Sequence, residues 1–472
     1  MASHNHNNLK IHDHCTVAPP SATQSSLPLT FFDLFWLRFH PVERIFFYSL
    51  HASQSHPSYF FDKLVTKLKT SLSHTLQHFP LLAGKIVWPS DFENPIIQYI
   101  PGDAVSLILA HSDADFEDML SDSPHETTKS RSLVPHLESS DSHASIMSLQ
   151  ITLFPNRGFS IGVSTHHAVL DGKSSTLFIK AWASLCKTND ESPSLVPKLE
   201  PFFDRKVIKD PTDLGIDHIH NLSEMLSKSF PQENSDGRCL KILPFQPRLE
   251  DTVRATFVLA REDLETIKKR VLSKWDVFKG TESSKPTTLS SFVLTSAHTV
   301  VCIAKATQGV HREKQKFTFT FTFDCRARLE PPIPENFCGN CVWGRMVDTE
   351  PLDFIKEEGL VVVAKSIHHK IKMVKKEGVF HGTENMLSKY MALAKDGVQI
   401  VSVAGSNRFG VYGIDFGWGK PAKVEIMSVD RGLTIGLAES RDGKGGVEVG
   451  LVLNKHVMNL FSHLFHQGLR HD

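Results

Sequence analysis

Val163-Ser164-Thr165-His166-His167-Ala168-Val169-Leu170-Asp171-Gly172 is the stretch that predicts most about the fold and chemistry of this chain. Before it, apolar residues alternate with small polar ones from Phe159 to Val163, which is the pattern of a half-buried strand. After it, apolar residues recur at helical spacing from Phe178 to Leu185. The two histidines therefore lie where a strand ends and the chain turns toward a helix.

A histidine at such a position can accept a proton near neutral pH without a metal ion. Asp171 follows in the same turn, and two roles are open to it. It orients the imidazole, as the aspartate of a catalytic triad does, or it pairs with an arginine to hold the turn. The structural alternative for the whole motif is a turn histidine with a capping aspartate.

A second unusual segment lies near the C-terminal end, from Tyr412 to Pro421. Its closely spaced glycines and its proline are incompatible with the interior of a helix or strand, so the segment is predicted to be a tight loop. Within it stands Asp-Phe-Gly-Trp-Gly, residues 415–419. An aromatic-rich loop of this kind is more often structural than catalytic.

The His-x-x-x-Asp-Gly motif together with Asp-Phe-Gly-Trp-Gly resembles the paired signature of the plant BAHD acyl-CoA-dependent acyltransferases. Three further segments match the same family: Leu27–Asp33, Phe79–Gly84 and Asp324–Leu329. The resemblance extends along most of the chain. It implies an acyltransferase that moves an acyl group from a coenzyme A thioester directly to an alcohol, without a covalent enzyme intermediate.

The mixture of strands and helices in two halves indicates α+β or α/β layers. The resemblance implies an α/β fold of two chloramphenicol-acetyltransferase-like domains of similar size with a central channel. We expect an N-terminal domain at 1–186 with a disordered tail at 1–14, a crossover linker at 187–234 and a C-terminal domain at 235–472. A helix at 61–79 and a strand at 317–323 are predicted from their periodicity.

The resemblance also suggests a role for each motif residue. His167 is the catalytic base, because the second histidine of such a pair holds the first motif position, and His166 is structural. Asp171 is expected to pair with an arginine, as is Asp415, for which Arg326 or Arg328 is the partner. Asp415 is kept as a catalytic candidate beside the coenzyme A channel. Trp418 either donates its indole N–H to the oxyanion or, as we expect, packs the loop.

Acyl-CoA carries phosphates, so a basic channel mouth is expected, and one basic cluster stands out: Lys268, Lys269, Arg270 and Lys274. The alternative for this cluster is a solvated helix face. Ser290 and Ser291 match family positions near the pantetheine arm; alternatively they cap the following helix.

Within the family, this sequence most resembles the members that acylate a sugar hydroxyl of flavonoid, anthocyanin or phenolic glucosides. Phe337-Cys338-Gly339-Asn340-Cys341 resembles a Tyr-Phe-Gly-Asn-Cys motif of that branch, with Phe337 in place of Tyr and Cys338 in place of Phe. Malonyl-CoA is the expected co-substrate and a hydroxycinnamoyl-CoA the alternative. A malonyl carboxylate needs a cation if it is buried, and Lys173, then Arg157, are the candidates. The alternative outside enzymes is a catalytically silent acyltransferase-like binding protein.

Composition excludes several other classes. A chain of 472 residues is expected to form two domains. Its formal net charge of zero lacks the excess of positive charge that is typical of nucleic-acid-binding proteins. No apolar run approaches a membrane span, and the N-terminus has no apolar core of a secretory signal. Seven cysteines, an odd and sparse set, favour a reducing compartment. We therefore expect a cytoplasmic monomer with small-molecule substrates, no membrane or nucleic-acid partner, no metal and no bound cofactor.

Overall fold

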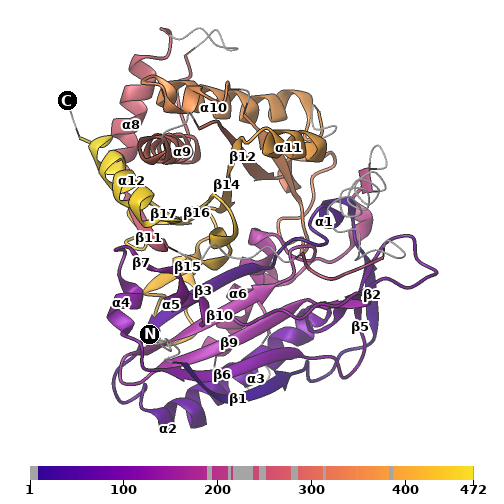
Figure 1. The fold of residues 1–472 in the computed structure, drawn as a ribbon. Coiled ribbons are helices and arrows are strands. Elements are labelled where there is room, and N and C mark those ends of the chain that lie inside the picture. The colour runs from indigo at the N-terminus through magenta and orange to yellow at the C-terminus, as the bar shows by residue number, and fades with distance from the viewer. Residues whose placement is uncertain are drawn as a thin grey trace.

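Two α/β domains pack against each other in the computed structural model (Figure 1). It describes residues 9–188, 194–210, 214–215, 238–243, 251–277, 285–311, 315–347, 349–381 and 386–470. The predicted two-domain α/β fold is therefore confirmed. Within the described residues, each half of the chain builds most of one domain around its own apolar core.

The N-terminal domain is built on a six-stranded sheet of mainly antiparallel strands. Its order is β1 (Leu9–Val17), β6 (Val105–Ser112), β9 (Met147–Phe154), β10 (Gly158–Thr165), β3 (Val42–Ser49) and β15 (Lys423–Ile426). A small second sheet has the order β2 (Ser25–Pro28), β5 (Ile96–Tyr99), β4 (Lys85–Val87) and β8 (His143–Ser145). The helices are α1 (Phe31–Leu34), α2 (Pro57–Tyr59), α3 (Thr66–His78), α4 (Phe116–Leu120), α5 (Thr127–Arg131) and α6 (Gly172–Lys187).

The C-terminal domain is built on a seven-stranded mixed sheet. Its order is β13 (Val342–Met346), β12 (Phe317–Asp324), β14 (Gln399–Gly405), β16 (Thr434–Glu439), β17 (Val447–Asn454), β11 (Thr252–Leu259) and β7 (His125–Glu126). The helices are α8 (Arg261–Ser273), α9 (Ser291–Val310), α10 (Gly359–Glu377), α11 (Met386–Lys395) and α12 (Lys455–Gln467).

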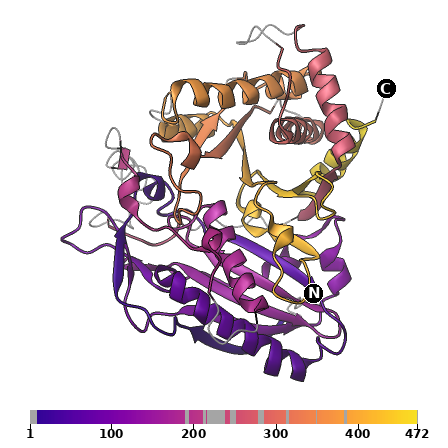
Figure 2. The ribbon, with the colours of Figure 1, turned by 180° about the vertical axis from the view of Figure 1, so that it is seen from behind.

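The two domains exchange strands. β15 comes from the C-terminal half but pairs antiparallel with β3 of the N-terminal sheet, and β7 makes the reverse crossing to β11. Figure 2 shows the crossing from behind, with a yellow-orange segment reaching down onto the purple domain. Because ladder hydrogen bonds cross in both directions, the cavity between the domains has walls that are fixed to each other.

The clearest predicted elements follow from their periodicity. β12 buries Phe317, Phe319 and Phe321 in the C-terminal core, as the alternation of phenylalanine with threonine predicts. The predicted helix at 61–79 is α3 preceded by a π-helical turn at Phe60–Val65. Leu68, Leu72 and Leu76 of α3 are fully buried, which is the stripe that the sequence shows.

The prediction of a disordered tail at 1–14 is wrong for residues 9–14, which belong to β1. Leu9 to Val17 pair with Val105 to Ser112 of β6, with an irregularity between Ile11 and Asp13. The sequence of β1 is largely polar and exposed, so no apolar alternation marks it; hydrogen bonds to a neighbouring strand hold it instead. Residues 1–8 lie outside the described part of the chain.

Most of the expected crossover, 187–234, lies outside the described residues, as do 235–237 and 244–250. A described part of it contacts the C-terminal half, because the Phe202 amide donates to the Asn336 carbonyl and the Phe202 carbonyl accepts from the Cys338 amide. Glu200 also lies 3.1 Å from His78 of α3, so the described part of the segment contacts both domains.

Candidate active site between the domains

A cavity of about 2350 Å³ opens between the two domains and is lined by both of them. Trp36, His40, Arg44 and His167 and one face of α6 line it from the N-terminal side. Strands β12 and β14, helices α10 and α11, and the loop that follows β14 line it from the other side. A ligand in this cavity would therefore touch residues that are far apart in the sequence.

His167 lies at the cavity wall, in the turn that follows β10. Its ring stacks on that of Trp36, with centroids 3.9 Å apart and planes 5° from parallel. Nδ1 is buried, so Nε2 is the ring nitrogen that faces the cavity. Burial is the main cause that lowers the pKa of His167 from 6.5 to about 4, and its own backbone carbonyl raises it less strongly. The ring is therefore neutral at physiological pH and able to accept a proton.

His166 is fully buried and does not line the cavity. Its Nδ1 accepts a hydrogen bond from the Ala168 amide at 3.2 Å, and its backbone amide donates to the Ile146 carbonyl at 2.8 Å. Burial lowers the pKa of His166 to about 3. The two neighbouring histidines are thus separated by environment: His166 packs inside the protein and His167 reaches the cavity.

Asp171 caps α6 and forms a buried ion pair. Its Oδ1 accepts from the Ser174 amide at 2.8 Å, and its Oδ2 lies 2.8 Å from Nη1 of Arg326. Both side chains of the pair are 1% exposed. Oδ2 also accepts from the Cys341 amide at 3.1 Å. Of the two roles considered for Asp171, the geometry is that of an aspartate that holds the turn through an arginine.

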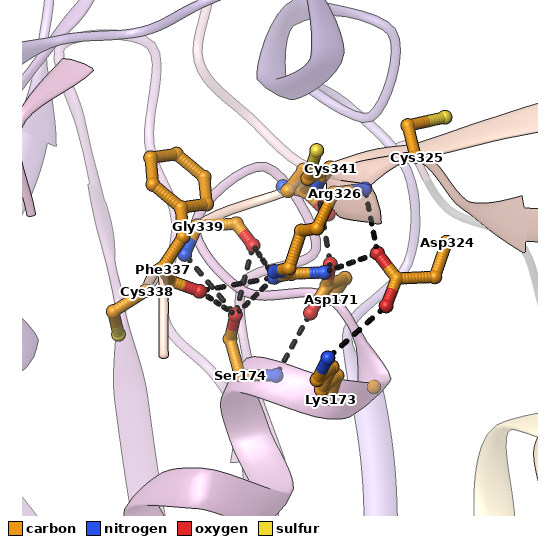
Figure 3. A network of polar contacts seen from close by, with 12 residues as sticks. Asp171, Lys173, Ser174, Asp324, Cys325, Arg326, Phe337, Cys338, Gly339 and Cys341 are labelled. Carbon is orange, nitrogen blue, oxygen red and sulfur yellow. Dashed lines mark hydrogen bonds and ion pairs between the residues drawn. The ribbon is translucent and has the colours of Figure 1, made fainter. Parts of the chain in front are cut away.

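Arg326 is the centre of a polar network that joins the domains (Figure 3). Besides Asp171, Nη1 contacts Asp324 Oδ1 at 3.0 Å, and Nη2 donates to the Ser174 hydroxyl and to the carbonyls of Phe337 and Gly339. Burial by itself lowers the pKa of Arg326, but the Asp171 and Asp324 carboxylates more than offset it and hold the guanidinium charged. The network is therefore a charged cross-link.

Three consecutive residues of the segment 339–341 bind the turn that carries His167. The Gly339 amide donates to the Ser174 hydroxyl at 3.1 Å, and Asn340 Nδ2 donates to the His167 carbonyl at 2.8 Å. Cys341 reaches Asp171, as described above. A Cβ at residue 339 would lie 1.9 Å from an Arg205 nitrogen, which accounts for glycine there. The Gly-Asn-Cys sequence thus positions the turn.

Asp33 extends this arrangement to the N-terminal motif. Its Oδ1 accepts from both the amide and Nδ2 of Asn340, at 3.1 and 3.0 Å. Its Oδ2 accepts from the amide and hydroxyl of Thr30. The Leu27–Asp33 motif therefore orients the amide that holds His167.

The prediction that Asp415 pairs with Arg326 or Arg328 is wrong. Asp415 Oδ2 pairs with Nζ of Lys187, at the end of α6, at 2.6 Å, and Oδ1 accepts from the amides of Gly417 and Gly419. Burial alone would raise the pKa of Asp415, but Lys187 and the two amides lower it overall. Arg326 is occupied by Asp171 and Asp324 instead. Asp415 lines the cavity, while both its oxygens brace its own loop.

Trp418 packs the same loop onto the N-terminal domain. Its ring meets that of Phe159 edge to face, with centroids 6.1 Å apart, and the Lys67 ammonium lies 5.7 Å from the ring centroid. Phe416 of this loop is fully buried against Trp182, at 4.9 Å. Trp418 does not line the cavity.

Of the expected acyl-CoA-binding residues, Ser290, Ser291 and Lys173 line the cavity and Lys274 does not. Ser290 caps α9 through the Val293 amide, and the Ser291 hydroxyl accepts from Asn407. Lys173 lies 3.2 Å from Asp324. Lys274 follows α8, on which Lys268 lies 3.2 Å from Glu265 and Arg270 donates to the Gly468 carbonyl. This cluster is a solvated helix face on the outer side of the domain (Figure 1).

Arg157 was the second candidate for a malonyl carboxylate, and its position excludes it. It lies in the turn before Gly158, whereas His167 follows Thr165 at the other end of β10. Eight extended residues separate the two ends by roughly 25 Å. Arg157 is exposed and does not line the cavity.

Several cavity residues carry no sequence signal of their own: Trp36, His40, Arg44, Lys180 and Arg431. They come from a loop, β3, α6 and the turn after β15, and only the tertiary fold brings them together. Burial lowers the pKa of His40 to about 4, so this second cavity histidine is also neutral.

The seven cysteines are free thiols. In the part of the chain that the structure describes, no group of histidine, cysteine and acidic side chains is arranged to hold a metal ion. No helix among the described residues is long and apolar enough to cross a membrane.

Comparison with known proteins supplies relatives over the whole chain. The model of the Transferase family matches residues 8–467. Phenolic glucoside malonyltransferase 1 of Arabidopsis thaliana is 42% identical over 470 residues, 98% of each chain. Malonyl-CoA:anthocyanidin 5-O-glucoside-6''-O-malonyltransferase of the same plant is 40% identical over 463 residues, 96% of each chain.

Solved structures share the fold at lower identity. Vinorine synthase matches with a TM-score of 0.67 and 19% identity over 96% of each chain. TRI101 of F. graminearum, complexed with coenzyme A and T-2 mycotoxin, matches with a TM-score of 0.63 and 14% identity, covering 93% of this chain and 96% of that one.

We predict that Asp171→Asn lowers the stability of the protein. The amide keeps a cap for α6 but leaves Arg326 without its closest carboxylate, and breaking a buried pair costs about 3–5 kcal/mol. The apparent Tm in thermal unfolding measures the effect. Asp118→Asn is the control, because its pair with Lys129 is exposed and is worth at most about 1 kcal/mol. A stable Asp171→Asn protein that has lost its activity would instead indicate that Asp171 orients the histidine.

We also predict that acid destabilises the protein below pH 6.5. The pKa of buried His298 is lowered from 6.5 to about 4, mainly by burial, so between these values the unfolded chain binds the extra proton. Stability is complete above pH 6.5 and falls toward pH 4, by on the order of 3 kcal/mol for one such histidine. His298→Gln should reduce the slope of Tm against pH, and the exposed His456→Gln should not. Equal slopes in both variants would contradict the assignment.

Proposed function

The chain belongs to the Transferase family and is a BAHD acyltransferase, and we propose that it moves a malonyl group from malonyl-CoA to a sugar hydroxyl of a phenolic or flavonoid glucoside. The observation that carries the reaction type is the neutral His167 ring, fixed at the wall of a cavity that both domains line. The malonyl donor and the glucoside acceptor are supported by the names of the relatives at 42% and 40% identity.

His167 acts on the acceptor hydroxyl. As the hydroxyl oxygen attacks the carbonyl carbon of the thioester, Nε2 accepts its proton. The tetrahedral intermediate collapses, the carbon–sulfur bond breaks, and the coenzyme A thiolate takes the proton from the imidazolium. The thioester is already activated, so no acyl-enzyme is needed. A neutral base is required at the start, and His167, whose pKa burial lowers, is neutral before the substrates bind.

The surrounding residues position this base. Trp36 holds the ring plane, and Asn340 holds the His167 backbone. The Asp171–Arg326 pair fixes the turn to β12. A base that is displaced by about 1 Å loses much of its effect, so these contacts act on the rate through the position of His167. Asp415 is proposed to support the loop beside the coenzyme A channel.

The purified chain, incubated with malonyl-, acetyl- and coumaroyl-CoA and a set of phenolic and flavonoid glucosides, tests the donor and acceptor. Free thiol release and product mass measure turnover. We expect thiol release with malonyl-CoA to depend on a glucoside and to give a product heavier by one malonyl group. Preference for coumaroyl-CoA, the kind of donor used by a hydroxycinnamoyl transferase, would overturn the malonyl assignment. Absence of turnover with every pair would indicate a binding protein.

We predict that His167→Ala lowers kcat by about a hundredfold to ten-thousandfold, the usual contribution of a general base. The apparent Tm should change little, because the ring lies at a cavity wall. His166→Asn is the comparison: its ring packs inside the protein, so it should lower Tm and affect kcat less. The reverse order of the two effects on kcat would show that the base is assigned to the wrong histidine.

A further inference from the structure

We propose that Arg44 binds the free carboxylate of the malonyl group and thereby selects the acyl donor. The inference rests on the proposed function, because it names the residue that recognises its co-substrate. Arg44 lies on β3, is 7% exposed and lines the cavity. Its Nη1 donates to the Thr176 hydroxyl on α6 at 3.0 Å.

What distinguishes Arg44 is that its charge has no counter-ion in the described part of the chain. The other two buried arginines at the cavity are neutralised, Arg326 by Asp171 and Asp324, and Arg431 by Glu43 at 2.7 Å. Arg44 makes no ion pair with any described residue, and its one polar hydrogen bond goes to a neutral hydroxyl. A buried charge without a partner is costly, so a ligand that supplies the negative charge would be bound strongly.

The neighbours of Arg44 leave a net positive charge on this wall. Lys180, one helical turn after Thr176, lines the cavity and donates to the Phe409 carbonyl. Glu439 acts electrostatically on both Arg44 and Lys180 but is not in ion-pair contact with either. Lys198 also lines the cavity and acts on Lys180, so three cations face one carboxylate, and a ligand carboxylate would reduce the net positive charge of this wall.

Burial lowers the pKa of both cations, Arg44 and Lys180. It lowers the pKa of Arg44 to about 10, and Glu439 raises it less. Burial also lowers the pKa of Lys180, and Arg44 contributes to that shift. The wall therefore holds its positive charge at a cost in free energy, which a bound carboxylate would offset.

The position of Arg44 fits the geometry of a malonyl thioester. Arg44 pairs with Val163 of β10, two residues before Thr165, after which the chain turns to His167. Thr176 lies one turn of α6 beyond Gly172, about 6 Å along the helix. The cation is thus on the same wall as the base but displaced from it. In a malonyl thioester one methylene separates the carboxylate from the reacting carbonyl, so its cation must be near the base without contacting the reacting carbon.

Lys173 is a weaker candidate for the same task. It is already paired with Asp324 at 3.2 Å, and its side chain is 35% exposed. A ligand carboxylate would have to compete with Asp324 and with water. The structure therefore favours Arg44 over the residue that the sequence suggested first.

The test compares catalytic efficiencies, kcat/KM, for malonyl-CoA and acetyl-CoA in wild type and in Arg44→Met. Acetyl-CoA lacks only the carboxylate, so the ratio of the two efficiencies isolates its recognition. We expect the ratio to fall about ten- to a hundredfold, the loss typical of one charge-assisted contact, while the Kd of free coenzyme A is unchanged. Arg44→Lys should restore part of the ratio. Arg44→Gln keeps a donor for Thr176 and replaces Arg44→Met if that variant does not fold.

Arg345→Met is the matched control. Arg345 is buried on β13, away from the cavity, and donates to the carbonyls of Val379 and His381. Its loss should lower Tm and leave the donor ratio unchanged. Arg44→Met should not lower the Tm of the ligand-free protein, because removal of the Arg44 charge leaves no carboxylate without its ion-pair partner.

Four results would overturn the inference. An unchanged ratio in Arg44→Met excludes the contact, and an equal loss for both donors and for free coenzyme A would place a phosphate at Arg44. A shift of the ratio in Lys173→Met but not in Arg44→Met would assign the carboxylate to Lys173. A large fall in Tm in both Arg44→Met and Arg44→Gln would make Arg44 structural. If wild type does not turn over malonyl-CoA, the proposed function fails, and titration of the two donors into both proteins still tests Arg44.

Discussion

The ion pair between Asp171 and Arg326 is the contact on which the rest of the site depends. It joins the turn after β10 in one domain to the end of β12 in the other, and both charges are almost completely buried. A pair of this kind is favourable only when its remaining donors and acceptors are satisfied. Ser174, Cys341 and the carbonyls of Phe337 and Gly339 supply most of those partners, and among the described residues only Nε of Arg326 in this pair is left without one. The pair therefore requires its surroundings to be in one arrangement, and that arrangement also places Asn340 on the backbone of His167.

The position of the base is thus set from across the domain boundary. The N-terminal domain supplies His167 and the ring of Trp36, and the C-terminal domain supplies Arg326 and the segment 339–341. The exchange of β15 and β7 between the sheets resists relative movement of the domains. The arrangement around His167 therefore does not depend on a flexible hinge between the domains.

Local patterns predicted what local physics determines. The strand–turn–helix around His167, the buried face of β12 and the capping position of Asp171 follow from periodicity and from the preference of aspartate for a helix start. The strand β1 was missed because its polar residues are held by backbone pairing with β6. The partner of Asp415 was missed for a related reason. Any nearby cation can pair with a loop aspartate, and only the packing of the loop against α6 selects Lys187.

The electrostatic properties of the site were even harder to predict from the sequence. A run of basic residues in the sequence suggested a phosphate site, but a run on one helix face is solvated, as α8 shows. Arg44 lies between Glu43 and Ile45 in a largely apolar strand and gives no such signal. Its importance appears only when burial is compared with the positions of all the carboxylates around the cavity.

That comparison separates two kinds of residue in this site. Charges that are balanced within the protein, such as Arg326 and Arg431, hold the structure whatever ligand is present. Acyl transfer from any coenzyme A thioester needs the same base and the same support, so these residues cannot discriminate between donors. A charge at the cavity wall that no protein group neutralises interacts with the acyl group itself, because only the ligand can supply the opposite charge. Donor selection in this fold is therefore expected to reside in the residual charge of the cavity and not in the motifs that identify the family.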